Sequence, residues 1–436
     1  MKKYNVLVFP CSTEIANEII NSLQYHKYFR LHFASSVPVS YCNYREKEIN
    51  ILPYITESSF ESRLNELIER KKINFIIPAH DDVSYILSLI EDKINAKIIG
   101  QSRKVNEIVR FKDKTYKYFE NILPIPKVFA GKPKKEEFPV FTKPLKGQGS
   151  FNSQKLNSLK ECEAFFELNK REEFIVMEFL PGEEFTIDCF SDKGKVLYFG
   201  ARTREKTTRG ISIQSTFVSD DELNRKFENY ANIISESLQL HGIFFFQMKF
   251  DSNRQLKLLE IGPRVAGTMM LNRVRGVNFV ELALYQALGY DIEIAFNQIE
   301  VSLARALVPI YKHNISYENI YIDFDDTLFL DEKFINPDII RLIFQEKNKG
   351  KKIYLITKNK KLNLANILHK FGIAYIFDEI IHINEDKMKA NFMKPSSILI
   401  DDSFSERKEA IKMGNFAFDC NSIALLFDPN GGMEDE

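Results

Sequence analysis

The sequence predicts an α/β protein of two or three domains: an open-sheet N-terminal region, a central α+β region and a C-terminal region with its own sheet. Three observations support this prediction. Short apolar runs alternate with helical patterns in the first hundred residues, the stretch 247–264 has the pattern of a β-hairpin, and an apolar run at 319–322 leads directly into a group of aspartates. With 436 residues and 44% apolar content, the chain can bury several cores.

The composition narrows the range of partners. Sixty basic and sixty acidic residues cancel, so no global field attracts nucleic acid or a membrane, and small molecules are the expected partners. The five cysteines show no CxxC spacing, which favours reduced thiols. No stretch approaches membrane-spanning length, and the apolar run before Pro10 is too short for a signal peptide. We therefore expect a cytoplasmic protein.

The N-terminal region reads as a βαβ alternation. Apolar runs at 4–9, 29–35, 74–79 and 97–100 are separated by helical patterns such as 14–23 and 60–70. A glycine-rich dinucleotide turn is absent, because the first glycine of the chain is Gly100. Polar residues that follow the strands are candidates for a substrate crevice: Ser12, Thr13, His80, Asp81 and Asp82. His80 is equally a candidate for a helix cap.

The central region begins with a predicted helix over 104–123 and a proline-marked connector. A strand at 139–144 contains Lys143 near its end and leads into the short glycine loop 145–150. Glycine lets backbone N–H groups approach a phosphate closely, and lysine supplies positive charge, so this loop is a candidate phosphate site. The loop alone is weak evidence.

Two further stretches are candidates for ligand contacts. Residues 174–188 read as two strands joined by a turn at Pro181-Gly182, and an apolar strand that runs into acidic residues could stack an adenine and hold a ribose. Positive charge is concentrated in 201–210, which is either a solvated face or a site for an anion.

The predicted hairpin at 247–264 brings Gln247 and Glu260 together. Apolar residues alternate on each side of the polar turn 251–254, so these two oxygen-bearing side chains could face each other across adjacent strands. Such a pair suits a hard cation, and Arg264 just beyond it suits an anion. An ordinary hairpin with solvent-facing polar residues is the alternative.

Over roughly residues 1–310 the order of these parts resembles the ATP-grasp superfamily, which implies a pre-ATP-grasp open sheet followed by ATP-grasp α+β lobes. The resemblance implies roles for particular residues. Lys114 and Lys143 match its phosphate cations, and Gln247 and Glu260 match its metal ligands. Arg264 matches the arginine that stabilises the transferring phosphate or a substrate carboxylate. The other expected nucleotide contacts are the loop residues Lys146, Gly147 and Gly149, the adenine hinge Glu178, Phe179 and Leu180, the ribose contact Glu184, and the basic residues Arg202 and Arg209.

One departure from the family concerns the end of the hairpin. Family members commonly read E-x-N-P-R there, with the asparagine completing the metal shell, whereas this chain has Gly262. A water could substitute for the missing oxygen, or a second metal could be held weakly.

The resemblance implies ATP and Mg²⁺, with Mn²⁺ as an alternative, and attack of a carboxylate on the γ-phosphate to give an acylphosphate. An amine would then form an amide. A carboxylate kinase, another non-amide enzyme and a regulatory nucleotide-binding protein are the alternatives. A homodimer is expected only at the level of the family.

The C-terminal region carries a sharper motif. Residues 319–322 are apolar for the most part and lead into Asp323-Phe324-Asp325-Asp326-Thr327. Three further features follow in order: an apolar strand pattern that ends in Thr357, Lys389 in a helical segment, and an apolar strand pattern that ends in Asp401-Asp402. Over about 318–430 this set resembles the haloacid dehalogenase superfamily, which implies a Rossmann-like domain.

That resemblance implies a phosphatase. Asp323 would be the nucleophile and Asp325 the acid/base, while Thr357 and Lys389 would hold phosphoryl oxygens, with Lys387 as the rival of Lys389. The expected Mg²⁺ ligands are Asp323, the Asp325 carbonyl, and Asp401 or Asp402. The spacing between motifs leaves room for a connecting helix, and then for a helix and a strand, but not for a large cap. A domain that only mediates assembly is the alternative.

The predicted domains are 1–105, 106–312 and 313–436. The combined hypothesis is a bifunctional enzyme that joins a small-molecule carboxylate to an amine or phosphorylated amine and removes a phosphate from the substrate or the product.

Overall fold

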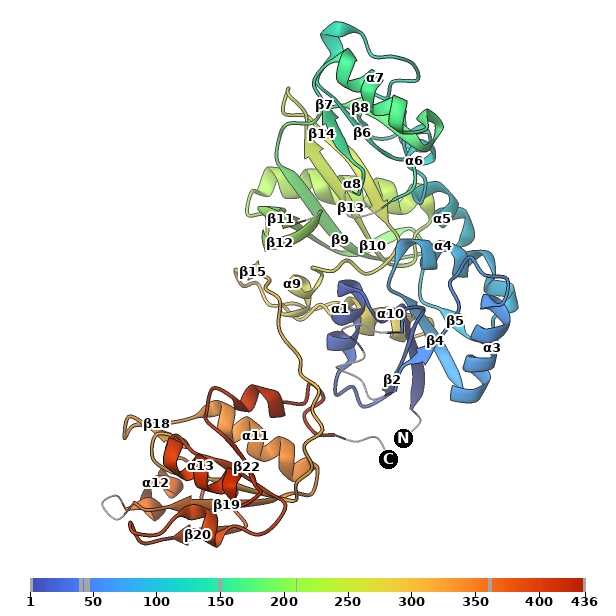
Figure 1. Ribbon diagram of the computed structural model, residues 1–436. Helices are drawn as coiled ribbons and strands as arrows, with labels where there is room; N and C mark the ends of the chain where they lie inside the picture. The colour runs from blue at the N-terminus through green and yellow to red at the C-terminus, as the bar shows by residue number, and fades with distance from the viewer. Residues whose placement is uncertain are drawn as a thin grey trace. The chain divides into compact units, whose positions relative to one another are not determined.

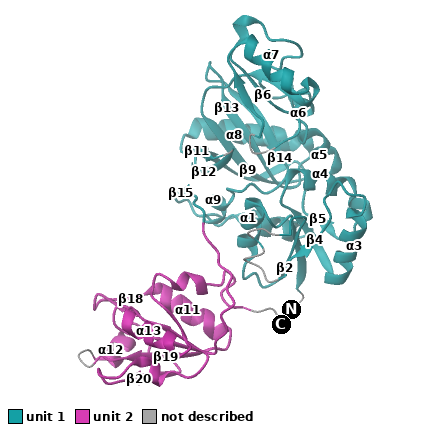
Figure 2. Cartoon of the chain, in the orientation of Figure 1, with its two compact units in different colours: residues 1–42, 48–307 teal, residues 43–47, 308–436 magenta. Residues whose placement is uncertain are grey.

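The computed structural model describes residues 3–38, 42, 48–147, 151–208, 210–359 and 363–433. The chain forms two compact units, and the boundary between them lies at Leu307–Val308 (Figure 2). Among the described residues, no helix is both long enough and apolar enough to cross a membrane.

Unit 1 begins with a parallel five-stranded sheet in the order β3-β2-β1-β4-β5 (Figure 1). Its strands are β1 (Tyr4–Phe9), β2 (Phe29–Ser35), β3 (Asn50–Ile51), β4 (Ile73–Pro78) and β5 (Lys97–Ile98). Helices α1 (Glu14–Leu23), α3 (Phe60–Lys71) and α4 (Asp81–Leu89) connect them, and η1 (Glu91–Lys93) follows α4. Both faces of β1 are buried: Val6 and Val8 belong to the core that contains α1, and Leu7 and Phe9 belong to the core that contains α3 and α4. This explains its uninterrupted apolar run.

The predicted helix over 104–123 is wrong as one element. It is divided into α5 (Arg103–Val109) and α6 (Lys112–Phe119), because Phe111 has an extended backbone conformation. Because of the break, Arg110 lies at the end of α5, whereas Lys112 and Lys114 lie in α6.

A small lobe follows, in which β6 (Val140–Pro144) pairs antiparallel with both β7 (Gln154–Leu156) and β8 (Phe174–Glu178). Helix α7 (Leu159–Leu168) connects β7 to β8, and the short helices η2 (Lys135–Glu137) and η3 (Arg171–Glu173) lie before β6 and β8.

The large sheet of unit 1 is antiparallel in the order β10-β9-β13-β14. Its strands are β9 (Glu184–Asp192), β10 (Lys195–Thr203), β13 (Gly242–Phe250) and β14 (Leu256–Gly262). One face is apolar and packs on α8 (Asp221–Leu238), through residues such as Phe246 and Met248 on the sheet and Phe227 and Ile234 on the helix. Because side chains alternate along a strand, the neighbouring positions on these strands face the other side, and they are largely polar.

Unit 1 is completed by a small sheet and two helices. Strands β11 (Lys206–Thr208), β12 (Ile211–Thr216) and β15 (Ser302–Ala304) pair in that order, and helices α9 (Met270–Arg273) and α10 (Phe279–Ala287) follow β14. Helix α10 packs into the core that contains α1 and β1.

Unit 2 contains a parallel sheet in the order β20-β19-β16-β21-β22. Its strands are β16 (Asn319–Ile322), β19 (Lys352–Thr357), β20 (Glu379–His382), β21 (Ser397–Ile400) and β22 (Phe416–Phe418). The helices are α11 (Pro337–Asn348), α12 (Leu364–Lys370), α13 (Phe404–Lys412), η4 (Lys389–Phe392) and η5 (Ile423–Leu426). Between β16 and β19 lie the hairpin β17 (Phe329–Leu330)–β18 (Phe334–Ile335) and α11, and between β19 and η4 lie α12 and β20. These short connections match the predicted spacing without a large cap.

Candidate functional site

The polar face of the large sheet of unit 1 holds the predicted pair. Gln247 on β13 is directly paired with Glu260 on β14, as the hairpin pattern predicted. The alternation of apolar residues along β14 is broken between Leu258 and Ile261, which are three positions apart. The cause is a shift of register, since Gln247 pairs with Glu260 but the next residue, Met248, pairs with Leu258. Leu259 is the extra residue of this bulge, and its carbonyl is left to accept hydrogen bonds from Tyr116 Oη at 2.9 Å and Lys143 Nζ at 3.2 Å.

Lys143 and Lys112 bring positive charge to this face. Lys143 is buried, and its Nζ donates to Tyr116 Oη at 2.9 Å, while Lys112 Nζ donates to the Gly147 carbonyl at 3.2 Å. Burial lowers the pKa of each lysine to about 8, although Glu260 opposes this shift. Both ammonium groups are therefore hydrogen-bonded to neutral oxygens and keep their charge available for an anion.

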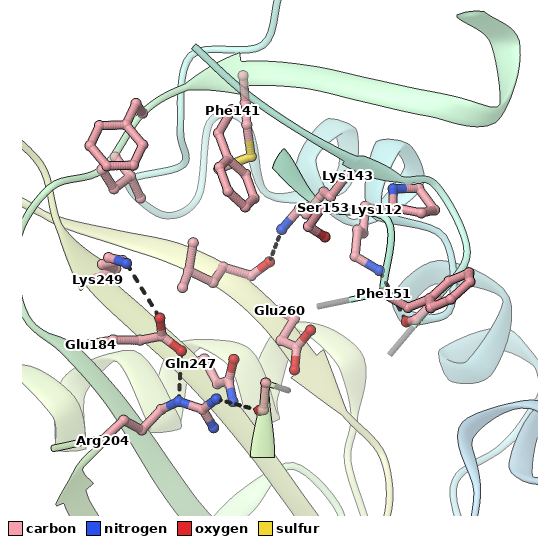
Figure 3. Close-up of a pocket in the computed structure, with 17 residues that line it drawn as sticks. Lys112, Phe141, Lys143, Phe151, Ser153, Glu184, Arg204, Gln247, Lys249 and Glu260 are labelled. Atoms are coloured by element: carbon pink, nitrogen blue, oxygen red, sulfur yellow. Dashed lines mark hydrogen bonds and ion pairs between the residues drawn. The ribbon is translucent and has the colours of Figure 1, made fainter. Parts of the chain in front are cut away.

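A cavity of about 820 Å³, open mouth included, lies between the small lobe and the polar face of the large sheet (Figure 3). It is lined by basic, acidic and aromatic side chains, among them Lys112, Lys143, Arg204, Lys249, Glu184, Gln247, Glu260, Phe141, Phe151 and Phe179. The apolar part of the lining suits a flat base, and the charged part suits phosphates and a cation.

The predicted adenine hinge lies at one wall of the cavity. Phe179 and Leu180 line it together with Met177, and Lys155 Nζ lies 4.5 Å from the centre of the Phe179 ring. The Glu178 side chain instead accepts a hydrogen bond from the Lys127 N–H at 2.9 Å and does not line the cavity. The Glu178 N–H also donates to the Lys127 carbonyl at 2.9 Å, so the side chain and the N–H of Glu178 both bind residue 127.

Glu184, the predicted ribose contact, lies between two cations. Its carboxylate is 2.7 Å from Arg204 Nε and 3.5 Å from Lys249 Nζ (Figure 3). In the orientation that satisfies its hydrogen bonds, the Gln247 amide donates to Glu260 at 3.2 Å and accepts from Arg204 at 3.0 Å. Arg204 and Lys249 were not among the predicted site residues. Lys249 lies two positions after Gln247 on β13, so the period of two along that strand could have identified it, whereas Arg204 lies just beyond the end of β10.

Lys114 and Arg202, like Glu178 and Lys146, are predicted nucleotide contacts that do not line the cavity. Lys114 is exposed, and its Nζ lies 4.7 Å from the centre of the Phe111 ring. It lies two positions after Lys112 on α6, and this separation places it on a different face of the helix from Lys112. Arg202 is 1% exposed and makes a double hydrogen bond to Asp188 at 2.8 and 3.2 Å. That buried pair has a structural role, and Arg204 lies at the cavity instead.

The basic and glycine-rich loops are only partly described. Gly149 and Arg209 lie outside the described residues. Gly147 lines the cavity, and Lys146 extends to Asp82 at 3.1 Å.

Arg264 is held by the N-terminal sheet region. Its guanidinium makes two hydrogen bonds to Asp81, at 2.6 and 2.7 Å, across 183 positions of sequence. His80 caps α4 by accepting from the Asp82 N–H, so the capping interpretation of His80 is the one observed. Asp81, Lys112, Phe245 and Arg264 line a smaller cavity that shares Glu260 with the first.

The second candidate site is at the carboxyl end of the parallel sheet in unit 2. Lys389 Nζ forms an ion pair with Asp323 and lies 2.7 Å from Asp401 Oδ2; all three side chains are buried. Burial raises the pKa of Asp323 to about 7, although the Lys389 ammonium opposes the shift, and burial also raises the pKa of Asp401. Carboxylate oxygens of Asp323, Asp401 and Asp402 lie within 4.8 Å of one another, which suits a hard cation.

The remaining predicted residues surround this group. Thr357 ends β19 and accepts from the Asn359 N–H at 2.9 Å, and Asn359 Nδ2 donates to Asp325. The Asp402 N–H donates to Thr327 Oγ1 at 3.0 Å. Lys387 is exposed and its Nζ lies 3.9 Å from Asp386, so the structure brings Lys389, not its rival, to the aspartates.

Sequence reasoning missed two supports in unit 2. Glu406 is buried and accepts from the Lys389 N–H at 2.8 Å while it pairs with Lys358. Asn359 holds Asp325. Both lie outside the motifs, and no spacing signal identifies them.

Comparisons with known proteins bear on unit 1. A family model described as "ATP-grasp in the biosynthetic pathway with Ter operon" matches residues 170–305. No curated protein sequence matches the chain significantly. The matched model ends before unit 2, so the phosphatase resemblance rests on the residues of unit 2 alone.

Solved structures share the fold at low identity. The biotin carboxylase domain dimer of Hydrogenobacter thermophilus 2-oxoglutarate carboxylase, in complex with MgADP, ADP and bicarbonate, has a TM-score of 0.56 at 16% identity, over 68% of this chain and 72% of its own. N5-carboxyaminoimidazole synthetase from Staphylococcus aureus, complexed with ADP, has 0.56 at 15%, over 67% and 79%. The L-amino acid ligase of Bacillus licheniformis has 0.52 at 17%, over 66% and 75%. Residues 170–305 of unit 1 therefore match an ATP-grasp family model, and unit 1 shares the fold of these solved structures.

Proposed function

We propose that the ATP-grasp domain of unit 1 is an ADP-forming carboxylate–amine ligase. The observation that carries this proposal is one cavity whose walls present Lys112 and Lys143 opposite Glu260 and Gln247, with aromatic side chains at one end. Two of the structural neighbours were solved with ADP or MgADP, and one is an L-amino acid ligase.

The residues fit ATP and Mg²⁺. Glu260 would hold the cation through its carboxylate. Gln247 would join it once its amide turns to place the oxygen, instead of the nitrogen, toward Glu260, and a bound Mg²⁺ would supply positive charge beside the phosphates. Lys112 and Lys143 would hold phosphate oxygens, Phe179 and Leu180 would contact the base, and Glu184 would bind the ribose.

The reaction requires charge stabilisation and positioning more than covalent help. A carboxylate oxygen of the substrate attacks the γ-phosphorus, and the bond to the β,γ-bridging oxygen breaks to release ADP. An amine then attacks the acyl carbon, phosphate leaves and the nitrogen loses a proton to solvent. Arg264, fixed by Asp81, is the group we assign to the transferring phosphate or the substrate carboxylate.

We also propose that unit 2 is a haloacid dehalogenase-type phosphatase. The observation that carries this is Lys389 between Asp323 and Asp401, with Asp325 and Thr357 beside them. Asp323 would attack phosphorus while Asp325 gives its proton to the leaving oxygen. Asp325 would then take a proton from the water that hydrolyses the aspartyl-phosphate. A Mg²⁺ bound by Asp323, the Asp325 carbonyl, and Asp401 or Asp402 would offset their repulsion.

The ligase proposal is tested by screening carboxylates with amines or phosphorylated amines for ADP release, followed by mass measurement of the product. Hydroxylamine should trap the acylphosphate as a hydroxamate. Phosphorylation of a carboxylate with no dependence on an amine would favour a carboxylate kinase, and ATP binding without turnover would favour a regulatory protein.

The phosphatase proposal is tested separately. Asp323→Asn should abolish hydrolysis of p-nitrophenyl phosphate and leave ADP formation intact. Unchanged hydrolysis would refute the assignment of Asp323.

We extend to this chain the homodimer seen for the carboxylase domain, and sedimentation velocity measures the oligomeric state.

A further inference from the structure

The position of Gly262 is not an open gap. Gly262 is paired with Phe245 on the adjacent strand, on the same sheet face as Glu260 and Gln247. A Cβ atom added at Gly262 would lie 2.2 Å from two carbons of the Phe245 ring, far inside van der Waals contact. The ring is 5% exposed, so it fills the space that a side chain at 262 would need.

The carboxylates that line the two adjoining cavities are Glu184, Glu260 and Asp81, among the described residues. Glu184 is paired with Arg204 and Lys249, and Asp81 is paired with Arg264. Glu260 lies beside the neutral Gln247 amide. Mg²⁺ is usually bound through one or two carboxylates together with phosphates. Of the three carboxylates, only Glu260 forms no ion pair with a cation among the described residues, so these cavities offer one carboxylate for a metal ion.

Positive charge also lies against the Phe245 ring. The guanidinium carbon of Arg264 lies 5.3 Å from the centre of the Phe245 ring, and Asp81 fixes the same guanidinium from its edge. A second metal ion at this position would meet an aromatic ring and a fixed cation instead of oxygen ligands.

We propose that the nucleotide site binds a single divalent cation, through Glu260 and Gln247, and that Phe245 with Arg264 excludes a second ion beside it. The inference rests on the proposed nucleotide function of unit 1. Next to Phe245, the Arg264 guanidinium supplies the positive charge that a second ion would otherwise bring to the phosphates.

The test is the number of Mn²⁺ ions bound by the full chain in equilibrium dialysis against Mn²⁺ and ADP. Glu260→Gln should lower the count by one ion per chain, and Asp81→Asn should leave it unchanged. The aspartates of unit 2 are a separate site, which Asp401→Asn identifies. Loss of two ions in Glu260→Gln, or loss of one in Asp81→Asn, would overturn the single-ion proposal.

A measurement on the unaltered protein covers the case in which a variant does not fold. The electron paramagnetic resonance spectrum of the Mn²⁺–ADP complex should lack the signal of a spin-coupled pair of ions, and a coupled pair would overturn the proposal. Absence of ADP binding is a different result, because it would contradict the nucleotide function itself.

Discussion

The buried lysines of the two units differ in their partners. In unit 1, Lys143 donates to the Tyr116 hydroxyl and the Leu259 carbonyl, and no carboxylate of the described residues forms an ion pair with it. In unit 2, Lys389 lies between Asp323 and Asp401. Removing the first charge leaves neutral oxygens behind, whereas removing the second leaves two buried carboxylates facing each other. We therefore expect substitution of Lys143 to affect mainly ligand binding, and substitution of Lys389 to affect the folding of its unit as well.

Lys389→Met should produce the largest effect. Removing one partner of a buried ion pair costs about 3–5 kcal/mol, since the remaining charges lose their compensation. We expect that loss of stability in unit 2 without divalent cations, together with loss of phosphatase activity. Hydrogen exchange of peptides from β16, followed by mass spectrometry, measures it.

Lys387→Met is the matched control, because Lys387 is exposed and lies two positions away. It should change neither hydrogen exchange nor activity. Added Mg²⁺ should recover part of the stability of Lys389→Met. Equal protection of β16 in both variants would contradict the comparison.

Lys143→Met should weaken ATP binding about 100-fold, because a charge-assisted contact to phosphate is worth about 2–3 kcal/mol. Lys143→Met should lower the free energy of unfolding of unit 1 by less than Lys389→Met lowers that of unit 2. Titration calorimetry with ATP and Mg²⁺ measures the affinity.

Lys114→Met controls for a general loss of positive charge, since Lys114 is exposed beside Phe111. It should bind ATP as the unaltered protein does. If Lys114→Met has the larger effect, Lys114 is the phosphate contact and the cavity lined by Lys112 and Lys143 is not the phosphate site.

The same comparison explains which site residues could be predicted from sequence. The residues of unit 2 follow parallel strands, and such strand ends meet at one edge of the sheet. Their positions after apolar runs were therefore enough to bring Asp323, Thr357 and Asp401 together. The hairpin brings Gln247 and Glu260 to adjacent strands, as its pattern predicted, but the turn and the alternation alone would pair Gln247 with Leu259. The direct pairing with Glu260 depends on the bulge at Leu259.

Other residues depend on contacts that have no local signal. Choosing between Lys112 and Lys114 requires the rotation of α6, and choosing between Arg202 and Arg204 requires knowing that Asp188 neutralises the first. The pairing of Asp81 with Arg264 joins segments 183 positions apart, so no pattern in either segment predicts it. The break in the helix predicted over 104–123 was missed because the apolar periodicity continues across Phe111.

Asn359→Ala tests a neutral support beside the charged group of unit 2. Asn359 donates to Asp325, so its loss should leave the acid/base less well positioned and lower kcat by about 10–100-fold, part of the usual contribution of general acid catalysis. The loss should be larger for an alkyl phosphate than for p-nitrophenyl phosphate, whose leaving group needs little protonation. Equal losses with both substrates would point to a purely structural effect.

The smallest expected effect is the response of unit 1 to pH. Burial lowers the pKa of Lys112 and Lys143 to about 8, so both lysines are mostly charged at pH 7 and mostly neutral at pH 9. Phosphates bind the charged form, and a lysine one unit above its pKa is about one-tenth charged, so affinity for ATP should fall about tenfold for each of the two lysines as the pH rises between these values. Calorimetric titration with ATP across this range measures the change, and Lys143→Met should show a shallower dependence. An affinity that is constant up to pH 9 in the unaltered protein would mean that these lysines keep an ordinary pKa and that the cavity is more hydrated than its walls indicate.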